Sequence, residues 1–210
     1  MAKPKVVLVT DPMCSWCWGM ADEFEQARHQ LGELVEFDLI LGGINVHGTQ
    51  PIGDYGRRFL RRLWQEVTET TGQQFGELYP EEYVHNSVLP CLAVQAVNDL
   101  SGAVRFDVLY QMQADFFRQG CNINDREYLS ELARNYETDL DRFHKLLNST
   151  EQLAKLQFQF DLAGTFGTQA LPSLLVGEDP EDANRLSLLA GGYVDADMLN
   201  TLVHARLSRV

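Results

Sequence analysis

Two cysteines near the start of the chain, Cys14 and Cys17, have the spacing of a redox-active dithiol. An apolar run at residues 6–9 precedes them, and a helical pattern begins at about Cys14 and continues to Gln30. A helix N-terminus has unpaired N–H groups and a positive dipole end, which lower a cysteine pKa from about 8.5 to roughly 3.5–7.5. We therefore expect Cys14, at the first helical position, to be a nucleophile with a lowered pKa. Cys17, one turn later, would resolve the mixed disulfide.

Two other interpretations of this pair remain open. The spacing also occurs in half of a zinc site, and a structural zinc ion usually takes four protein ligands. Cys91, Cys121 and the five histidines form no second pair at ligand spacing, so we expect no metal. Both cysteines could also be small core residues without reactivity, which is the role we expect for the unpaired Cys91 and Cys121. The strand-to-helix context favours redox chemistry.

The composition is that of a globular protein of 210 residues, with 45% hydrophobic and 22% charged residues. The net charge of −13 would repel a phosphate backbone, so nucleic acid is not an expected partner. The apolar run at residues 6–9 is shorter than the roughly 7–15 residues of a secretory signal. No stretch approaches the ~20 apolar residues of a membrane span. We expect a cytoplasmic protein that does not bind a membrane.

Hydrophobic periodicity divides the chain into three parts. Residues 5–49 read as a βαβ unit, with strands at residues 6–10 and 35–41. From about residue 50 to 148 we find five apolar stripes at helical spacing, one of them opened by the capping pair Asn124 and Glu127. In residues 149–210, capping residues and apolar runs predict a helix capped by Ser149, strands at 173–176 and 186–190, and a last helix capped by Asp195. The prediction is a domain of residues 1–49 and 149–210, interrupted by a helical insertion at 50–148.

Two motifs and this order of elements resemble the DsbA family of thioredoxin-fold thiol–disulfide oxidoreductases, in particular its intracellular FrnE-like branch. The motifs are DPMCSWCWG at residues 11–19 and TQALPSL at residues 168–174. The resemblance implies an α/β, thioredoxin-like fold with a large all-helical insertion that covers the site. It also implies a cis peptide bond between Leu171 and Pro172 that faces the cysteines. The inner dipeptide, Ser15-Trp16, has no histidine, so we expect a less oxidising pair than that of the periplasmic members.

Further residues have predicted roles beside the cysteines. Ser15 and Trp16 would contact substrate, although Trp16 could equally pack on the insertion. Leu171 would present its backbone to a substrate strand, and Pro172 would belong to the substrate groove. Asp11 either caps the helix or transfers protons. We interpret two histidines as surface or capping residues, namely His47 and His85.

The expected function is thiol–disulfide oxidoreduction or isomerisation on protein or small thiol substrates. No cofactor is needed beyond the redox disulfide, with glutathione as a candidate co-substrate and a redox partner that the sequence does not name. The protein would be a monomer or homodimer. One alternative is a glutathione-dependent transferase or isomerase of the kappa type, against which Cys17 argues because those enzymes do not need a second cysteine. Another is a non-catalytic binding protein with vestigial cysteines.

Overall fold

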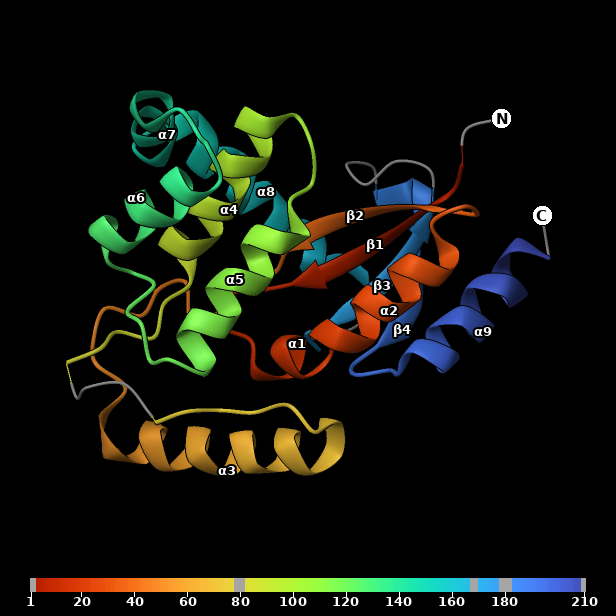
Figure 1. The fold of residues 1–210 in the computed structure, drawn as a ribbon, viewed down its shortest axis with the longest axis horizontal. Helices are drawn as coiled ribbons and strands as arrows, with labels where there is room; N and C mark the ends of the chain where they lie inside the picture. The colour runs from red at the N-terminus through yellow and green to blue at the C-terminus, as the bar shows by residue number, and fades with distance from the viewer. Residues whose placement is uncertain (1–2, 78–81, 167–169, 178–182, 209–210) are drawn as a thin grey trace.

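A four-stranded sheet forms the centre of the part of the chain that the computed structural model describes, residues 3–77, 82–166, 170–177 and 183–208 (Figure 1). The strand order is β2-β1-β3-β4. β1 pairs in parallel with β2, and β3 is antiparallel to both β1 and β4. The strands are β1 (Lys5–Thr10), β2 (Glu36–Leu41), β3 (Ser173–Gly177) and β4 (Leu186–Gly191).

The central strand β1 is buried on both faces. Val6 and Leu8 belong to the larger hydrophobic cluster, which also contains residues of α2 (Ala21–Leu31) and α9 (Ala196–Leu207). Val7 and Val9 point to the opposite face and join a smaller cluster with the end of α8 (Thr150–Ala163). Because successive side chains of a strand alternate between faces, the continuous apolar run at residues 6–9 supplies both layers.

Between β2 and α8 the structure contains helices and no strand among the residues described. They are α3 (Gly53–Thr71), α4 (Val88–Ser101), α5 (Phe106–Phe117), α6 (Arg126–Asn135) and α7 (Leu140–Leu147). Helices α4 to α7 pack on one another to one side of the sheet, whereas α3 extends along the edge of the molecule next to α1 (Ser15–Gly19) (Figure 1). The division of the chain into two domains stays a prediction.

Side-chain amides join this helical segment to the sheet. Gln159 of α8 accepts a hydrogen bond from the backbone N–H of Leu41 on the edge strand β2, at 2.9 Å. Its amide nitrogen donates to Gln95 of α4, and Gln95 in turn donates to the carbonyl of Gln152. The end of β2 is thereby held against α4 and α8.

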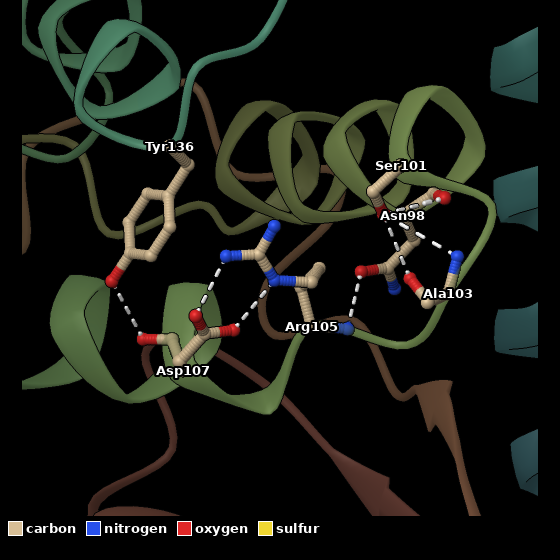
Figure 2. Close-up of polar contacts among 6 residues, drawn as sticks. All are labelled: Asn98, Ser101, Ala103, Arg105, Asp107 and Tyr136. Carbon is tan, nitrogen blue, oxygen red and sulfur yellow. Dashed lines mark hydrogen bonds and ion pairs between the residues drawn. The ribbon is translucent and has the colours of Figure 1, made fainter.

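A second polar network stabilises the turn between α4 and α5, away from the cysteines (Figure 2). The backbone N–H of Arg105 donates to Asn98, and its guanidinium forms two hydrogen bonds with Asp107 at 2.9 and 2.7 Å. The hydroxyl of Tyr136 donates to the Asp107 carbonyl. The guanidinium also holds the pKa of the Asp107 carboxyl below its usual range. This network connects the start of α5 with the ends of α4 and α6.

Two local predictions are wrong. The helix expected from Cys14 to Gln30 is two helices, α1 and α2, which meet at Met20 directly after Gly19. Glycine has a low helix propensity, which is consistent with a junction there. The N-cap of α6 is Asp125, whose side chain accepts from the N–H of Glu127, while Asn124 donates to a distant carbonyl. In the described part of the chain, no helix is both long and apolar enough to cross a bilayer.

Candidate active site

The two cysteines lie at the start of α1 and interact directly. Cys14 is the N-cap of α1, and the backbone N–H of Cys17 donates a hydrogen bond to the Cys14 sulfur at 3.2 Å. The N–H of Cys14 donates to the carbonyl of Asp11 at 3.1 Å, which closes the turn before the helix. Both cysteines are free thiols, and they are only 6% and 4% exposed. Cys14 therefore precedes the first helical position by one residue and caps the helix with its own sulfur.

Burial raises the pKa of the Cys14 thiol well above its ordinary value. The neighbouring Cys17 thiol and the Asp11 carboxylate raise this pKa further, and only the hydrogen bond from the Cys17 backbone lowers it. The lowered pKa that the sequence predicted is therefore wrong. That prediction included the helix N-terminus but omitted the desolvation that raises the pKa of a covered thiol.

A cavity of about 540 Å³ opens beside Cys14. Ile44, after the end of β2, and Leu171, before β3, form part of one wall. Residues of α3, among them Leu60 and Leu63, form a further, largely apolar part of the lining. Cys14 thus faces a space that a substrate side chain or short peptide segment could enter.

Helix α3 is held against α1 by a hydrogen bond and by close packing. The indole N–H of Trp64 donates to the Ser15 hydroxyl at 3.0 Å, and both residues are buried. One turn along α1, a Cβ on Gly19 would lie 2.6 Å from a methyl group of Val67. Ser15, predicted to contact substrate, lines the cavity, but its hydroxyl is already bonded to the helical segment.

Of the remaining predicted site residues, Trp16 and Leu171 line the cavity, whereas Pro172 does not. Trp16 lines the cavity, and its ring contacts Tyr193, between β4 and α9, at a centroid distance of 6.2 Å. The Leu171–Pro172 peptide bond is cis, as predicted. Leu171 lines the cavity together with Cys14, while Pro172 is buried and its carbonyl accepts from the N–H of Gly192 at 2.8 Å.

A family model described as Thioredoxin matches residues 8–198, a span that includes both cysteines and the cis proline. The chain belongs to the thioredoxin family. A candidate protein disulfide isomerase of known structure from Nitrosomonas europaea is 25% identical, with a TM-score of 0.87 and coverage of 99% of this chain and 98% of that one. The match confirms the predicted α/β thioredoxin-like fold with a large helical insertion, and the DsbA-family resemblance.

Two further similarities concern proteins with named roles. The cytosolic disulfide reductase DsbM of Pseudomonas aeruginosa is 22% identical, with a TM-score of 0.77 over 98% of this chain and all of that one. The ClpXP adapter protein SpxH of Bacillus subtilis is 22% identical over 173 residues, which cover 81% of this chain and 57% of SpxH. The chain therefore spans little more than half the length of this curated relative.

In this thioredoxin-family protein, Asp11 is a fully buried carboxylate beside the dithiol. It accepts hydrogen bonds from the N–H of Met13 at 2.7 Å, the Ser87 hydroxyl at 2.6 Å and the Cys91 thiol at 3.5 Å. Burial raises the pKa of Asp11 to about 6, although these hydrogen bonds oppose the shift. Asp11 thus stabilises the turn before α1, and its carboxyl group exchanges a proton at a pH close to neutral. The proximity of Ser87 and Cys91 had no signal in the sequence.

His85 is the cavity residue that sequence reasoning missed. It was predicted to be a surface or capping residue, but it lines the cavity with Cys14 and packs against Tyr83 and Phe116, whose rings also contact each other. Burial lowers the pKa of His85 to about 4, so the imidazole is neutral at physiological pH. Its Nδ1 is buried and has no hydrogen-bond partner among the described residues. His47, by contrast, is exposed.

The other two cysteines are free thiols, as expected, but only one is a core residue. Cys91 is fully buried, whereas Cys121 is partly exposed after α5. Burial raises the pKa of both thiols above the ordinary value. No group of three or more acidic, histidine or cysteine side chains suited to a metal ion occurs in the residues described.

Proposed function

We propose that this chain is a thiol–disulfide oxidoreductase or isomerase acting on protein or small-molecule disulfides, with Cys14 as nucleophile and Cys17 as resolving cysteine. The observation that carries the proposal is the 3.2 Å hydrogen bond from the Cys17 N–H to the Cys14 sulfur, beside a cavity of about 540 Å³. This N–H stabilises negative charge on Cys14 at the moment it attacks.

The reaction proceeds through a mixed disulfide. The Cys14 thiolate attacks one sulfur of the substrate disulfide, so a Cys14–substrate bond forms, and the other substrate sulfur leaves as a thiolate that takes a proton from water. Deprotonated Cys17 then attacks the Cys14 sulfur and releases the second substrate thiolate. The dithiol has lost two electrons and two protons, and the substrate disulfide has gained them. An external thiol is required to reduce the Cys14–Cys17 disulfide again.

We propose that the net direction is reduction. Because the pKa of Cys14 is raised, its thiolate is not specially stabilised. The reduced dithiol is then less favoured relative to the Cys14–Cys17 disulfide, so the pair is a weaker oxidant and a stronger reductant. The absence of a histidine from Ser15-Trp16 supports the same direction. So does the structural likeness to a protein named as a cytosolic disulfide reductase.

The remaining parts of the proposal concern substrates and location. Trp16 and Leu171, which line the cavity, would contact the segment that flanks the substrate cysteine. Pro172 does not line the cavity, and its proposed role is to hold Leu171 in place through the cis bond. Glutathione is the proposed external thiol, because the structure of DsbM has also been solved with GSH. That structure has a TM-score of 0.75 to this chain. We propose a cytoplasmic monomer or homodimer that uses no metal or bound cofactor.

Insulin reduction driven by glutathione tests this function. We expect turnover by the wild-type chain, loss of turnover in both Cys14→Ser and Cys17→Ser, and accumulation of mixed disulfides on Cys14 in Cys17→Ser. Cys121→Ser is the matched control, since this partly exposed thiol does not line the Cys14 cavity. Glutathione-dependent turnover retained in Cys17→Ser would instead indicate a kappa-type enzyme.

A second candidate function is non-catalytic protein binding, which the match of 81% of this chain to ClpXP adapter proteins favours. In that case the cysteines would be dispensable. Wild-type protein without turnover in insulin or small-disulfide assays, together with unchanged folding of a Cys14→Ser/Cys17→Ser variant, would support this alternative over the enzyme.

A further inference from the structure

Helix α3 carries a concentration of positive charge in a strongly acidic chain. Four of the 17 Lys and Arg residues of the chain lie in one six-residue segment of this helix, while the chain as a whole has a net charge of −13. We call these residues the arginine cluster; they are Arg57, Arg58, Arg61 and Arg62. Within the described parts of the chain, none of the four forms an ion pair, although other arginines do. The charge of the three exposed members, Arg58, Arg61 and Arg62, is therefore available to a partner.

The arginine cluster lies on the half of α3 that walls the cavity beside Cys14. Phe59, between the two arginine pairs, lines the cavity and is still 51% exposed. Helical spacing places Tyr55 and Arg62 next to Phe59, and Arg58 next to Tyr55 and Arg62, so that these exposed residues form one stripe. The N-terminal half of α3 also contains Asp54, so it carries four positive charges and one negative charge, while Glu66 and Glu69 occur in the other half. A positive, partly aromatic surface thus begins where the cavity opens.

The two arginine pairs have different surroundings. Arg57 and Arg61 line a separate cavity on the other side of α3, where Glu69 and Glu77 also lie. Arg58 and Arg62 are exposed and line neither cavity. Arg58 and Arg62 therefore share no cavity with Glu69 and Glu77, and Arg62 lies one turn from the cavity residue Phe59. Asp54 and Glu66 lie one turn from Arg58 and Arg62, respectively, and form no ion pair with them.

We propose that this site is selective for acidic polypeptide substrates, in which Asp or Glu residues lie within about four positions of the reacting cysteine. This inference rests on the proposed function. An extended peptide advances about 3.3 Å per residue and α3 rises 1.5 Å per residue, so two to four substrate residues span about the length of the Tyr55–Arg62 stripe. Guanidinium groups bind carboxylates with two parallel hydrogen bonds, and Tyr55 and Phe59 offer apolar contact between them.

The arginine cluster and the net charge of the chain favour peptides of opposite charge. A chain with a net charge of −13 should attract basic peptides and repel acidic ones over long range. The arginine cluster should reverse this preference at the point where the substrate cysteine must dock. The order of reaction rates among charged peptides therefore separates the two influences.

Single-turnover reduction of three peptides tests the inference. The peptides share one intermolecular disulfide and differ only in flanking Glu, Gln or Lys residues, and the full chain is used in its reduced form. Each turnover transfers two electrons and two protons from Cys14 and Cys17 to the peptide disulfide, so no other reductant is needed. We expect the Glu peptide to react about 10-fold faster than the Lys peptide at low salt, and this ratio to fall to about 2 in 0.5 M NaCl.

Charge-neutralising variants identify the residues responsible. Arg58→Gln/Arg62→Gln should lower the Glu-to-Lys rate ratio to about 2 or less at low salt. Arg134→Gln/Arg142→Gln is the matched control, since it removes two exposed arginines of α6 and α7, helices far from α3 (Figure 1), and should keep the ratio of the wild type. Circular dichroism checks that both variants fold, and the salt dependence of the wild type is a test that needs no variant.

The outcomes are distinct. A faster reaction of the Lys peptide in the wild type, or a ratio that Arg58→Gln/Arg62→Gln leaves unchanged, would overturn the acidic preference while the oxidoreductase function stands. Failure to reduce any of the three peptides would overturn the proposed function, and the selectivity with it.

Discussion

Trp64 donates a hydrogen bond from its indole N–H to the hydroxyl of Ser15, 3.0 Å away, and so links the helical segment to the residue between the two cysteines. The bond is buried, and Trp64 also stacks on Phe75 at a centroid distance of 5.0 Å. The wall of the cavity and the start of α1 are therefore fixed relative to each other by a specific polar contact as well as by packing.

The first prediction concerns this bond. Trp64→Phe and Ser15→Ala each remove one partner, and a double-mutant cycle in urea denaturation should give a coupling free energy of about 0.5–1.5 kcal/mol. Phenylalanine preserves most of the aromatic packing, so the cycle isolates the hydrogen bond from the ring contacts. Additive effects of the two substitutions would show that the contact contributes nothing to the free energy of unfolding.

The second prediction concerns the close approach of α1 and α3. Gly19→Ala places a methyl group 2.6 Å from Val67, so it should destabilise the fold by about 1–3 kcal/mol. Val67→Ala in the same chain should recover part of this loss. The matched control is Gly164→Ala, where a Cβ meets nothing within 4 Å and φ is −74°; its unfolding free energy should stay within about 1 kcal/mol of the wild type. Equal effects at the two glycines would contradict the steric explanation.

The third prediction concerns the reactivity of Cys14. Because burial and Cys17 raise its pKa, the rate of alkylation by iodoacetamide should still increase above about pH 8.5. Cys17→Ala removes one cause of the shift, so its rate profile should move to lower pH. Cys121→Ser removes the most exposed thiol from the background without touching the pair. A rate that reaches its plateau below pH 8 would mean that the helix N-terminus outweighs burial.

The fourth prediction is that Asp11 and His85 affect the pH dependence of stability in opposite directions. The pKa of Asp11 rises from 3.8 to about 6 on folding, so the folded state binds this proton more tightly and the free energy of unfolding falls as pH rises from about 4 to 6. The pKa of His85 falls from 6.5 to about 4, so the free energy of unfolding rises as pH rises from about 4 to 6.5. Each contribution is at most about 3 kcal/mol.

Urea denaturation of Asp11→Asn and His85→Gln at several pH values between 4 and 7 checks this. Relative to the wild type, Asp11→Asn should gain stability as pH rises, because the variant lacks the contribution of Asp11, which decreases over this pH range. His85→Gln should lose stability relative to the wild type over the same range. Difference curves that stay flat with pH would show that neither group titrates differently in the folded state.

Several elements followed from local sequence patterns. The apolar run at residues 6–9 became the two-faced central strand, and Ser149 and Asp195 cap α8 and α9 through their own side chains. The Cys14–Cys17 spacing placed the two sulfur-bearing residues at one helix start. These features depend on interactions between residues a few positions apart, which a sequence displays directly.

The tertiary structure alone decided the environment of the cysteines. Burial reversed the expected direction of the Cys14 pKa shift. The fold also brought His85 and Leu171 to the cavity beside Cys14, although they lie 71 and 157 positions beyond Cys14 in the chain. Asp11 was visible as a capping candidate, but its burial depends on Ser87 and Cys91 of a remote segment. Desolvation is the sum of what every neighbouring element covers, and no local pattern contains that sum.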